Sequence, residues 1–296
     1  MRTLVCVLCQ VRNGEITWPK FKENVLDVLG ADLALCISAD SNIKAGGKVV
    51  GVASEDNGFF HAAKYVFRYK ETDDWAVAWD EMTDGRWRQF HEIPGDWLGG
   101  VKTPIPHATS GAIGTFYRWL LVKNLVAKNL LAEYDQVIIT RSDYYWQKPH
   151  PVLDLDHVWL PNGEFHFGIT DRHMVLPSNL VEKFLGIGGT LGPEHYEAFS
   201  RYYSDSQFFR RFGVNLEGYL WFLYNHAEIH TKLGFFSQKM FVVAPAPPPQ
   251  NGVMIKYPDE YDAVMAPEGD LITWPYEIDH SHLSRHSMFV GNLKSK

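Results

Sequence analysis

An apolar segment that leads into a cation and a carboxylate is the part of the sequence best suited to chemistry. Residues 135–140 (DQVIIT) run directly into Arg141, Ser142 and Asp143. Residues two positions apart in an extended chain lie on the same side, so Arg141 and Asp143 should face the same way. Ligands of open α/β sheets bind at the carboxyl edge of the strands, where a carboxylate can hold a metal on a diphosphate and an arginine can bind the phosphate. The alternative is an Arg–Asp pair that only anchors a loop.

The elements before this motif predict an α/β protein. Residues 4–8 and 33–38 are continuous apolar runs, typical of strands covered on both faces. Residues 21–29, between them, have helical spacing of apolar side chains and stop at Gly30. A strand, a helix and a second strand in this order predict a parallel β-α-β unit.

The remaining elements follow from the same periodicities. We expect loops at 42–58 and 85–107, helices at 73–82, 110–131, 179–185, 193–203 and 215–226, and strands at 135–140, 158–160 and 240–244. Pro245, Pro247, Pro248 and Pro249 then form a stiff spacer. The tail still carries Trp274 and Phe289, so we expect it to pack back on the domain.

Composition narrows the class of protein. The 296 residues hold 28 Lys and Arg against 35 Asp and Glu, a net charge of −7, which argues against nucleic acid as the main partner. No apolar stretch reaches the roughly 18 residues of a membrane span, and the run at 4–8 is too short for a signal peptide. Cys6 and Cys9 are interpreted as core residues in a reducing compartment, with a redox or metal pair as the alternative. We therefore expect a soluble, cytoplasmic protein.

At residues 140–144 (TRSDY) the sequence resembles the R-x-D variant of the D-x-D motif in nucleotide-sugar-dependent glycosyltransferases of the GT-A fold. Three further segments agree in order. They are the first strand with the residues Gln-Val-Arg at 10–12, the segment 168–172 (GITDR), and residues 215–217 (NLE) at the start of a late helix. The resemblance covers residues 1–245.

The resemblance implies a fold and an activity. The fold would be a single GT-A-like (Rossmann-like) α/β domain over residues 1–244, with a mainly parallel central sheet. Residues 245–296 would form the proline spacer and a C-terminal extension that packs back. The activity would be transfer of a sugar from a nucleotide diphosphate sugar donor to a glycan acceptor.

The resemblance also implies a nucleotide-sugar site and a metal. The predicted donor-binding residues are Gln10, Arg12, Ser38, Asp40, Arg141, Ser142 and Asp143. The predicted metal is Mn²⁺ or Mg²⁺, held by Asp143 and by His282 of the C-terminal tail. Arg141 stands where D-x-D has its first acid, which leaves one carboxylate for the metal. A surface arginine at residue 12, a turn-forming Asp40 and solvated tail histidines are the alternatives.

Two acids are predicted to be catalytic by the same resemblance. Glu217 would be the base that deprotonates the acceptor hydroxyl, although an acid in the first turn of a helix is also explained by the helix dipole. Asp171 follows Gly168, which lets the backbone approach a sugar closely, and its carboxylate would bind sugar hydroxyls or take a proton. Ordinary loop charges are the alternative for Asp171.

Two other classes of function stay open. A carbohydrate-binding protein could keep the same fold without catalysis. A metal-dependent hydrolase could use His226 and His230, which are four residues apart. Four tryptophans could line an acceptor groove or belong to the core, namely Trp75, Trp79, Trp87 and Trp97. Binding of a nucleoside diphosphate would discriminate the transferase from both alternatives.

Overall fold

The structure is a computed structural model. It describes residues 1–40, 42–45, 48–52, 54–72, 74–93, 110–162, 168–186, 193–212, 216–245, 253–269 and 271–273. Within these residues no helix combines the length and the apolar character needed to cross a bilayer.

The central layer is a mainly parallel sheet in the order β13-β10-β8-β9-β6-β1-β2-β5. The strands β6, β1, β2 and β5 pair in parallel, and β8 and β10 also form a parallel pair. β9 runs antiparallel to both of its neighbours, and β13 runs antiparallel to β10. The strands are β1 (Thr3–Cys9), β2 (Asp32–Ser38), β5 (Ala63–Tyr69), β6 (Gln136–Thr140), β8 (Val158–Asn162), β9 (Met174–Pro177), β10 (Leu233–Ser237) and β13 (Ile272–Thr273).

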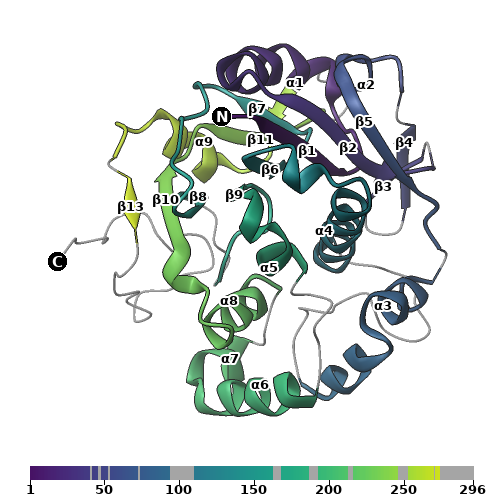
Figure 1. The fold of residues 1–296 in the computed structure, drawn as a ribbon, viewed down its shortest axis with the longest axis vertical. Coiled ribbons are helices and arrows are strands. Elements are labelled where there is room, and N and C mark those ends of the chain that lie inside the picture. The colour runs from purple at the N-terminus through teal and green to yellow at the C-terminus, as the bar shows by residue number, and fades with distance from the viewer. Residues whose placement is uncertain are drawn as a thin grey trace.

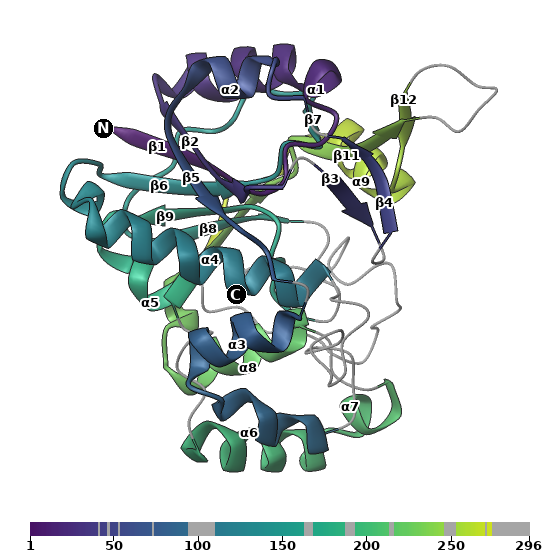
Figure 2. The ribbon, with the colours of Figure 1, turned by 90° about the vertical axis from the view of Figure 1, so that its right-hand side faces the viewer.

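Helices cover both faces of this sheet. Figure 2 shows α1 (Gly14–Phe21) and α2 (Gly58–Ala62) on one side, and α4 (Ser110–Ala127) and α5 (Val181–Leu185) on the other. Beyond α4 and α5 lie α3 (Trp75–Thr83), α6 (Pro193–Asp205), α7 (Gln207–Phe212) and α8 (Leu216–His226), as Figure 1 also shows. The helix α1 continues as a π-helical segment (Lys22–Asp27), and 3-10 turns occupy Arg86–Glu92, Leu130–Ala132, Ser178–Leu180 and His230–Lys232.

The apolar core has two parts because side chains of a strand alternate between faces. Leu4 and Cys6 of β1 belong to the cluster that includes Phe116 of α4. Val5 and Val7 belong to the cluster on the opposite face, together with α1. All four side chains of β1 are fully buried, which explains the continuous apolar run in the sequence.

A second, smaller sheet lies beside the first. It consists of β7 (Tyr144–Trp146), β11 (Met240–Pro245) and β12 (Val253–Ile255), with β11 in the middle and both pairs antiparallel. The helix α9 (Pro258–Met265) packs on β11 through Val264, which contacts the cluster of Phe241 and Val243. Residues of the C-terminal segment therefore lie directly against β11, the strand that pairs with β7 after the Arg-Ser-Asp motif.

The β-α-β unit and the mainly parallel α/β sheet predicted from the sequence are confirmed. The loop predicted at 42–58 is wrong, because the structure has a hairpin of β3 (Asn42–Ala45) and β4 (Lys48–Val52) there. The first helix begins at Gly14 rather than near residue 21. Pro19 lies inside this helix, and the sequence pattern gave no reason to expect a helix through a proline.

The predicted excursion at 85–107 is wrong in its first part. Trp87 and Phe90 lie on the 3-10 turn Arg86–Glu92, and both side chains are fully buried. The residues 94–109 lie outside the described part of the chain, as do the residues 246–250 of the proline spacer and 274–296 of the tail. The domain boundary at 244 stays a prediction.

Candidate functional site

The site begins where the chain leaves β1. Cys9 has a positive φ of 73°, and the amide of Gln10 donates to the carbonyl of Leu8 at 3.1 Å. This is the geometry of a γ-turn, which is rare and strained for a residue with a side chain. The turn directs residues 10–12 across the carboxyl end of β6, towards the Arg-Ser-Asp motif.

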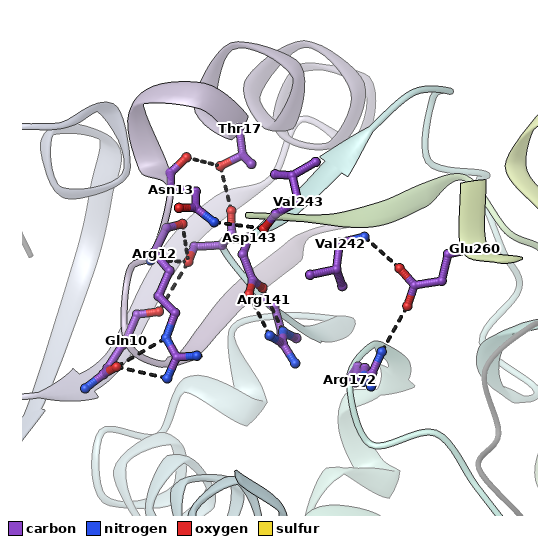
Figure 3. Close-up of polar contacts among 11 residues, drawn as sticks. Gln10, Arg12, Asn13, Thr17, Arg141, Asp143, Arg172, Val242, Val243 and Glu260 are labelled. Carbon is purple, nitrogen blue, oxygen red and sulfur yellow. Dashed lines mark hydrogen bonds and ion pairs between the residues drawn. The ribbon is translucent and has the colours of Figure 1, made fainter. Parts of the chain in front are cut away.

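Ser142 joins the two strand ends. Its hydroxyl accepts a hydrogen bond from the Arg12 amide at 2.7 Å and lies 3.2 and 3.1 Å from the carbonyl oxygens of Gln10 and Arg12, to one of which it donates. The Ser142 carbonyl in turn accepts from the Thr17 hydroxyl at 2.6 Å. The Arg12 guanidinium donates to the Gln10 side-chain oxygen through Nε and Nη2, at 3.2 and 3.0 Å. Figure 3 shows these contacts of Gln10 and Arg12.

Arg141 and Asp143 form a two-pronged ion pair. Nε and Nη2 of Arg141 donate to the two carboxylate oxygens of Asp143 at 2.7 and 2.6 Å (Figure 3). Burial by itself would raise the pKa of Asp143, but the Arg141 charge and its hydrogen bonds, helped by Arg12 and Lys256, hold that pKa below its usual range. The carboxylate is therefore charged, and each of its two oxygens accepts a hydrogen bond from the same guanidinium.

The remaining edge of Arg141 points to a ligand role. A guanidinium has five N–H donors in a planar fork, and Asp143 takes only the Nε and Nη2 edge. Nη1 makes no hydrogen bond to another described residue, and the side chain keeps 27% of its surface exposed. Asp143 thus holds Arg141 in one orientation, with an open edge that suits a phosphate oxygen.

A third arginine comes from α4. Arg118 is almost fully buried, and its Nη2 lies 3.1 Å from Oδ2 of Asp171 and also donates to the Asp171 carbonyl. The other carboxylate oxygen, Oδ1, has no partner among the described residues, and the Asp171 side chain is 17% exposed. Gly114, one turn before Arg118, lies beside this pair, and a Cβ there would be at ordinary contact distance, 3.4 Å, from Oδ2.

The charges of these groups act on one thiol, that of Cys9 at the end of β1. Burial raises the pKa of Cys9 to about 12, while the charges of Arg12, Arg141 and Arg118 act in the opposite direction. Asp171 reinforces the increase in pKa. The three cations and Asp171 therefore all act on one residue at the carboxyl end of β1.

The loop that carries Asp171 is packed against α8. A Cβ at Gly168 would lie only 1.9 Å from the Glu217 carbonyl oxygen, which accepts a hydrogen bond from the Ile169 amide at 3.0 Å. The loop reaches the same sheet edge because β9, which follows it, runs antiparallel to β6. The structure therefore brings Asp171 to the arginines and the backbone of Glu217 to the same loop. The Glu217 side chain is half-buried.

Ser38 is the last residue of β2 and Asp40 follows it at the same edge, two strands away from β6. The Ser38 hydroxyl accepts a hydrogen bond from the Asp40 amide at 3.1 Å, and the Asp40 side chain is exposed. This contact is local to the turn. A role of either residue in nucleotide binding stays a prediction.

The described residues do not by themselves fit a divalent cation. Both oxygens of Asp143 are held by Arg141, and no group of three or more His, Cys, Asp or Glu in the described ranges could bind a metal. His282 lies outside those ranges. The metal stays a prediction, and no step below depends on it.

Two histidines considered for a hydrolase do not share a helix face. The helix α8 ends at His226, and His230 lies on a separate 3-10 turn after Glu228, which has a positive φ of 56°. Their rings pack on different aromatic residues, Phe222 for His226 and Trp221 for His230. The core alternative holds for the tryptophans, since Trp75, Trp79 and Trp87 are all buried.

Sequence reasoning missed Arg118, Lys256 and Glu260. Arg118 is the one charged residue within the apolar stretch 115–122, and that isolation was a usable signal. Lys256 and Glu260 lie in the C-terminal segment, about a hundred residues beyond the motif that they approach, and no local pattern pointed to them. The contacts of Glu260 are described below.

Comparison with known proteins adds no relative. No protein-family model matches the chain, and no curated protein matches it in sequence. A function is therefore inferred from the residues and their geometry.

Proposed function

We propose that the chain is a nucleotide-sugar-dependent glycosyltransferase of the GT-A type, which moves a sugar from a nucleoside diphosphate to a glycan acceptor. The observation that carries this proposal is the geometry at the carboxyl edge of a mainly parallel sheet, where Arg12 is tied to the Arg-Ser-Asp motif through Ser142 and Asp143 orients Arg141. Arg118 orients Asp171 in the loop that leads into the neighbouring strand β9. Ligands of such sheets bind at that edge. A cluster of cations there suits a diphosphate, while an acid beside it suits a sugar.

The arginines would stabilise the leaving group. Breaking the bond between the sugar and the diphosphate places negative charge on the phosphate oxygens, and fixed cations stabilise that charge. Arg141 is held by Asp143 with one edge open, so it needs little reordering to bind an oxygen of the diphosphate. Arg12, steered by Gln10 and Ser142, would bind the same group from the end of β1.

Asp171 would act on the sugar or the acceptor. Its Oδ1 atom is open, while Oδ2 is held by Arg118. A carboxylate in this position can accept hydrogen bonds from hydroxyl groups, take the proton of an attacking hydroxyl, or stabilise positive charge at the anomeric carbon. Glu217, at the start of α8, is the second candidate for the base.

The test is a thermal-shift panel with UDP, GDP, ADP, CDP and their sugar conjugates at millimolar concentration. A ligand that binds only the folded chain raises the melting temperature, because stability increases by RT ln(1 + [L]/Kd). We expect at least one nucleoside diphosphate to raise it without added metal, and the cognate nucleotide sugar to be hydrolysed slowly or transferred.

Arg141→Gln supplies the critical variant and Arg88→Gln its matched control. Arg88 forms a similar two-pronged pair with Asp80, between α3 and the following 3-10 turn. Loss of a charge-assisted contact should weaken nucleotide binding by about 2–4 kcal/mol in Arg141→Gln and leave Arg88→Gln unchanged. If no nucleotide shifts the melting temperature but free sugars do, the chain is a carbohydrate-binding protein and the proposal is wrong.

A further inference from the structure

Glu260 is a buried carboxylate far from the motif in sequence. It lies on α9, and its side chain has no exposed surface. Oε1 accepts from Nη1 of Arg172 at 2.9 Å, and Oε2 accepts from the Val242 amide at 2.6 Å (Figure 3). A fully buried charge is costly unless it is paired and hydrogen-bonded, so both contacts are needed to keep it there.

The two partners of Glu260 belong to the two halves of the candidate site. Val242 lies on β11 and pairs with Tyr144 of β7, and the next amide on β11, that of Val243, donates to the Asp143 carbonyl at 3.0 Å. Arg172 directly follows Asp171. One carboxylate therefore connects the strand that holds the Arg-Ser-Asp motif to the loop that carries Asp171.

The rest of the C-terminal segment supports the same junction. The Arg172 guanidinium lies 4.9 Å from the ring centroid of Tyr257, the residue before α9. The Lys256 amide donates to the Val242 carbonyl at 2.9 Å, and the Lys256 charge contributes to the lowered pKa of Asp143. Contacts from residues 256–260 thus reach both sides of the site.

We propose that Glu260 is a positioning residue that fixes the phosphate-binding motif at Arg141 and the sugar-binding loop at Asp171 relative to each other. The inference rests on the proposed glycosyltransferase function. It makes residues 253–269 a working part of the site, although they lie beyond the region that resembles a glycosyltransferase. A displacement of about 1 Å between reacting groups can cost about 10²-fold in rate.

The first test is Glu260→Gln, with Glu268→Gln as the control. Gln keeps the volume and can still accept from the Val242 amide, but it loses the charge that pairs with Arg172. Glu268 also forms an ion pair, with Lys239 at 2.7 Å, but the Glu268 side chain is exposed. Hydrolysis of the nucleotide sugar that the wild-type chain cleaves is measured together with thermal shifts by the matching nucleoside diphosphate.

We expect kcat to fall by about 10- to 100-fold in Glu260→Gln. The shift caused by the nucleoside diphosphate should stay close to that of the wild type, because Arg12 and Arg141 are untouched. A purely structural role would lower the melting temperature but leave kcat unchanged well below it, and this result would overturn the inference. Equal losses of kcat in Glu260→Gln and Glu268→Gln would overturn it as well.

Arg172→Lys is a second variant, which tests the inference even if Glu260→Gln does not fold. It keeps the positive charge beside Glu260 but loses the planar fork that sets the geometry. A fall in kcat with little change in melting temperature supports the inference, and full kcat overturns it. If the wild-type chain neither binds a nucleoside diphosphate nor cleaves a nucleotide sugar, the proposed function fails and this inference fails with it. If the wild type does both and both variants match it, only the inference fails.

Discussion

Each carboxylate of the site is paired with an arginine and fixes its orientation. Asp143 uses both oxygens on Arg141, and Asp171 uses one oxygen on Arg118. Each pair leaves one polar edge open, Nη1 on Arg141 and Oδ1 on Asp171. A site built in this way presents a fixed cation and a fixed anion next to each other, which matches a substrate with a diphosphate on one side and a sugar on the other.

Arg118 and Asp171 should behave as one unit. The Arg118 side chain is only 4% exposed, so it has little room to contact a group other than Asp171. Its Nε–H has no hydrogen-bond partner among the described residues. We expect Arg118→Lys and Asp171→Asn each to lower kcat/KM by about 10- to 100-fold. The double variant should be no worse than the poorer single variant, because residues that act together give non-additive losses.

Steady-state transfer or donor hydrolysis measures this cycle. Lys123→Gln is the control on the same helix, since Lys123 makes an exposed pair with Glu81. If the loss of kcat/KM in the double variant equals the product of the two single losses, Arg118 contacts the substrate directly instead of holding Asp171.

Single residues were predictable where a short motif carried them. Arg141, Ser142 and Asp143 stand at the end of an apolar strand, and the structure brings them together with Gln10 and Arg12. The alternative left open for the motif, an Arg–Asp pair, is present in the structure between Arg141 and Asp143. Partners across the fold, such as Arg118 for Asp171, depend on tertiary packing that no local pattern encodes.

At the scale of elements, the contact between the Asp171 loop and α8 requires a glycine. A Cβ at Gly168 would overlap the Glu217 backbone, which cannot move without shifting the start of α8. We expect Gly168→Ala to lower the free energy of unfolding by about 1–3 kcal/mol and to reduce turnover, because the loop must move away from the helix.

Gly186→Ala is the matched control, because no atom lies within 4 Å of the added Cβ and the backbone there is an ordinary one. Urea denaturation of the two variants checks the difference in unfolding free energy. If Gly168→Ala is as stable and active as Gly186→Ala, the contact does not constrain the loop.

Elements were predictable in proportion to the strength of their periodicity. The buried strands β1, β2 and β6 appear as continuous apolar runs, and all three were expected. The strands β9 and β10 were missed, because residues 174–177 and 233–237 are short and follow directly on loops or turns. The hairpin at β3 and β4 was not predicted, because the two glycines at 46–47 are typical of a loop.

At the scale of the whole molecule, charge is segregated. The chain carries a net charge of −7, yet Arg12, Arg118 and Arg141 gather at the carboxyl end of β1. Such a local field attracts a small anion without making the surface basic. This arrangement suits the small anionic ligand proposed above, and the absence of a nucleic-acid partner stays a prediction.

The opposite side of the sheet edge holds two buried histidines whose protonation should limit stability in acid. The rings of His150 and His173 lie 5.5 Å apart and pack on Trp146 and Phe236. Their Nε2 atoms have no hydrogen-bond partner among the described residues. Burial lowers the pKa of His150 from 6.5 to about 4, against the effect of the Pro151 carbonyl. Burial and the neighbouring His150 also lower the pKa of His173.

The sign of the pH dependence follows from these shifts. Between pH 6.5 and 4 the unfolded chain binds a proton at residue 150 that the folded chain does not, so stability is complete above pH 6.5 and falls as the pH is lowered. From pH 7 to 5 this group should cost on the order of 2 kcal/mol of stability.

His150→Phe removes the titration and keeps an aromatic ring in the cluster, so its unfolding free energy should fall by about 2 kcal/mol less over that interval. His173, whose pKa is also lowered, contributes to the fall that persists in the variant. His61→Gln is the control, since His61 is exposed and pairs with Asp56. Urea denaturation at pH 7 and pH 5 measures all three chains. An equal fall in His150→Phe and the wild type would show that the buried ring does not set acid stability.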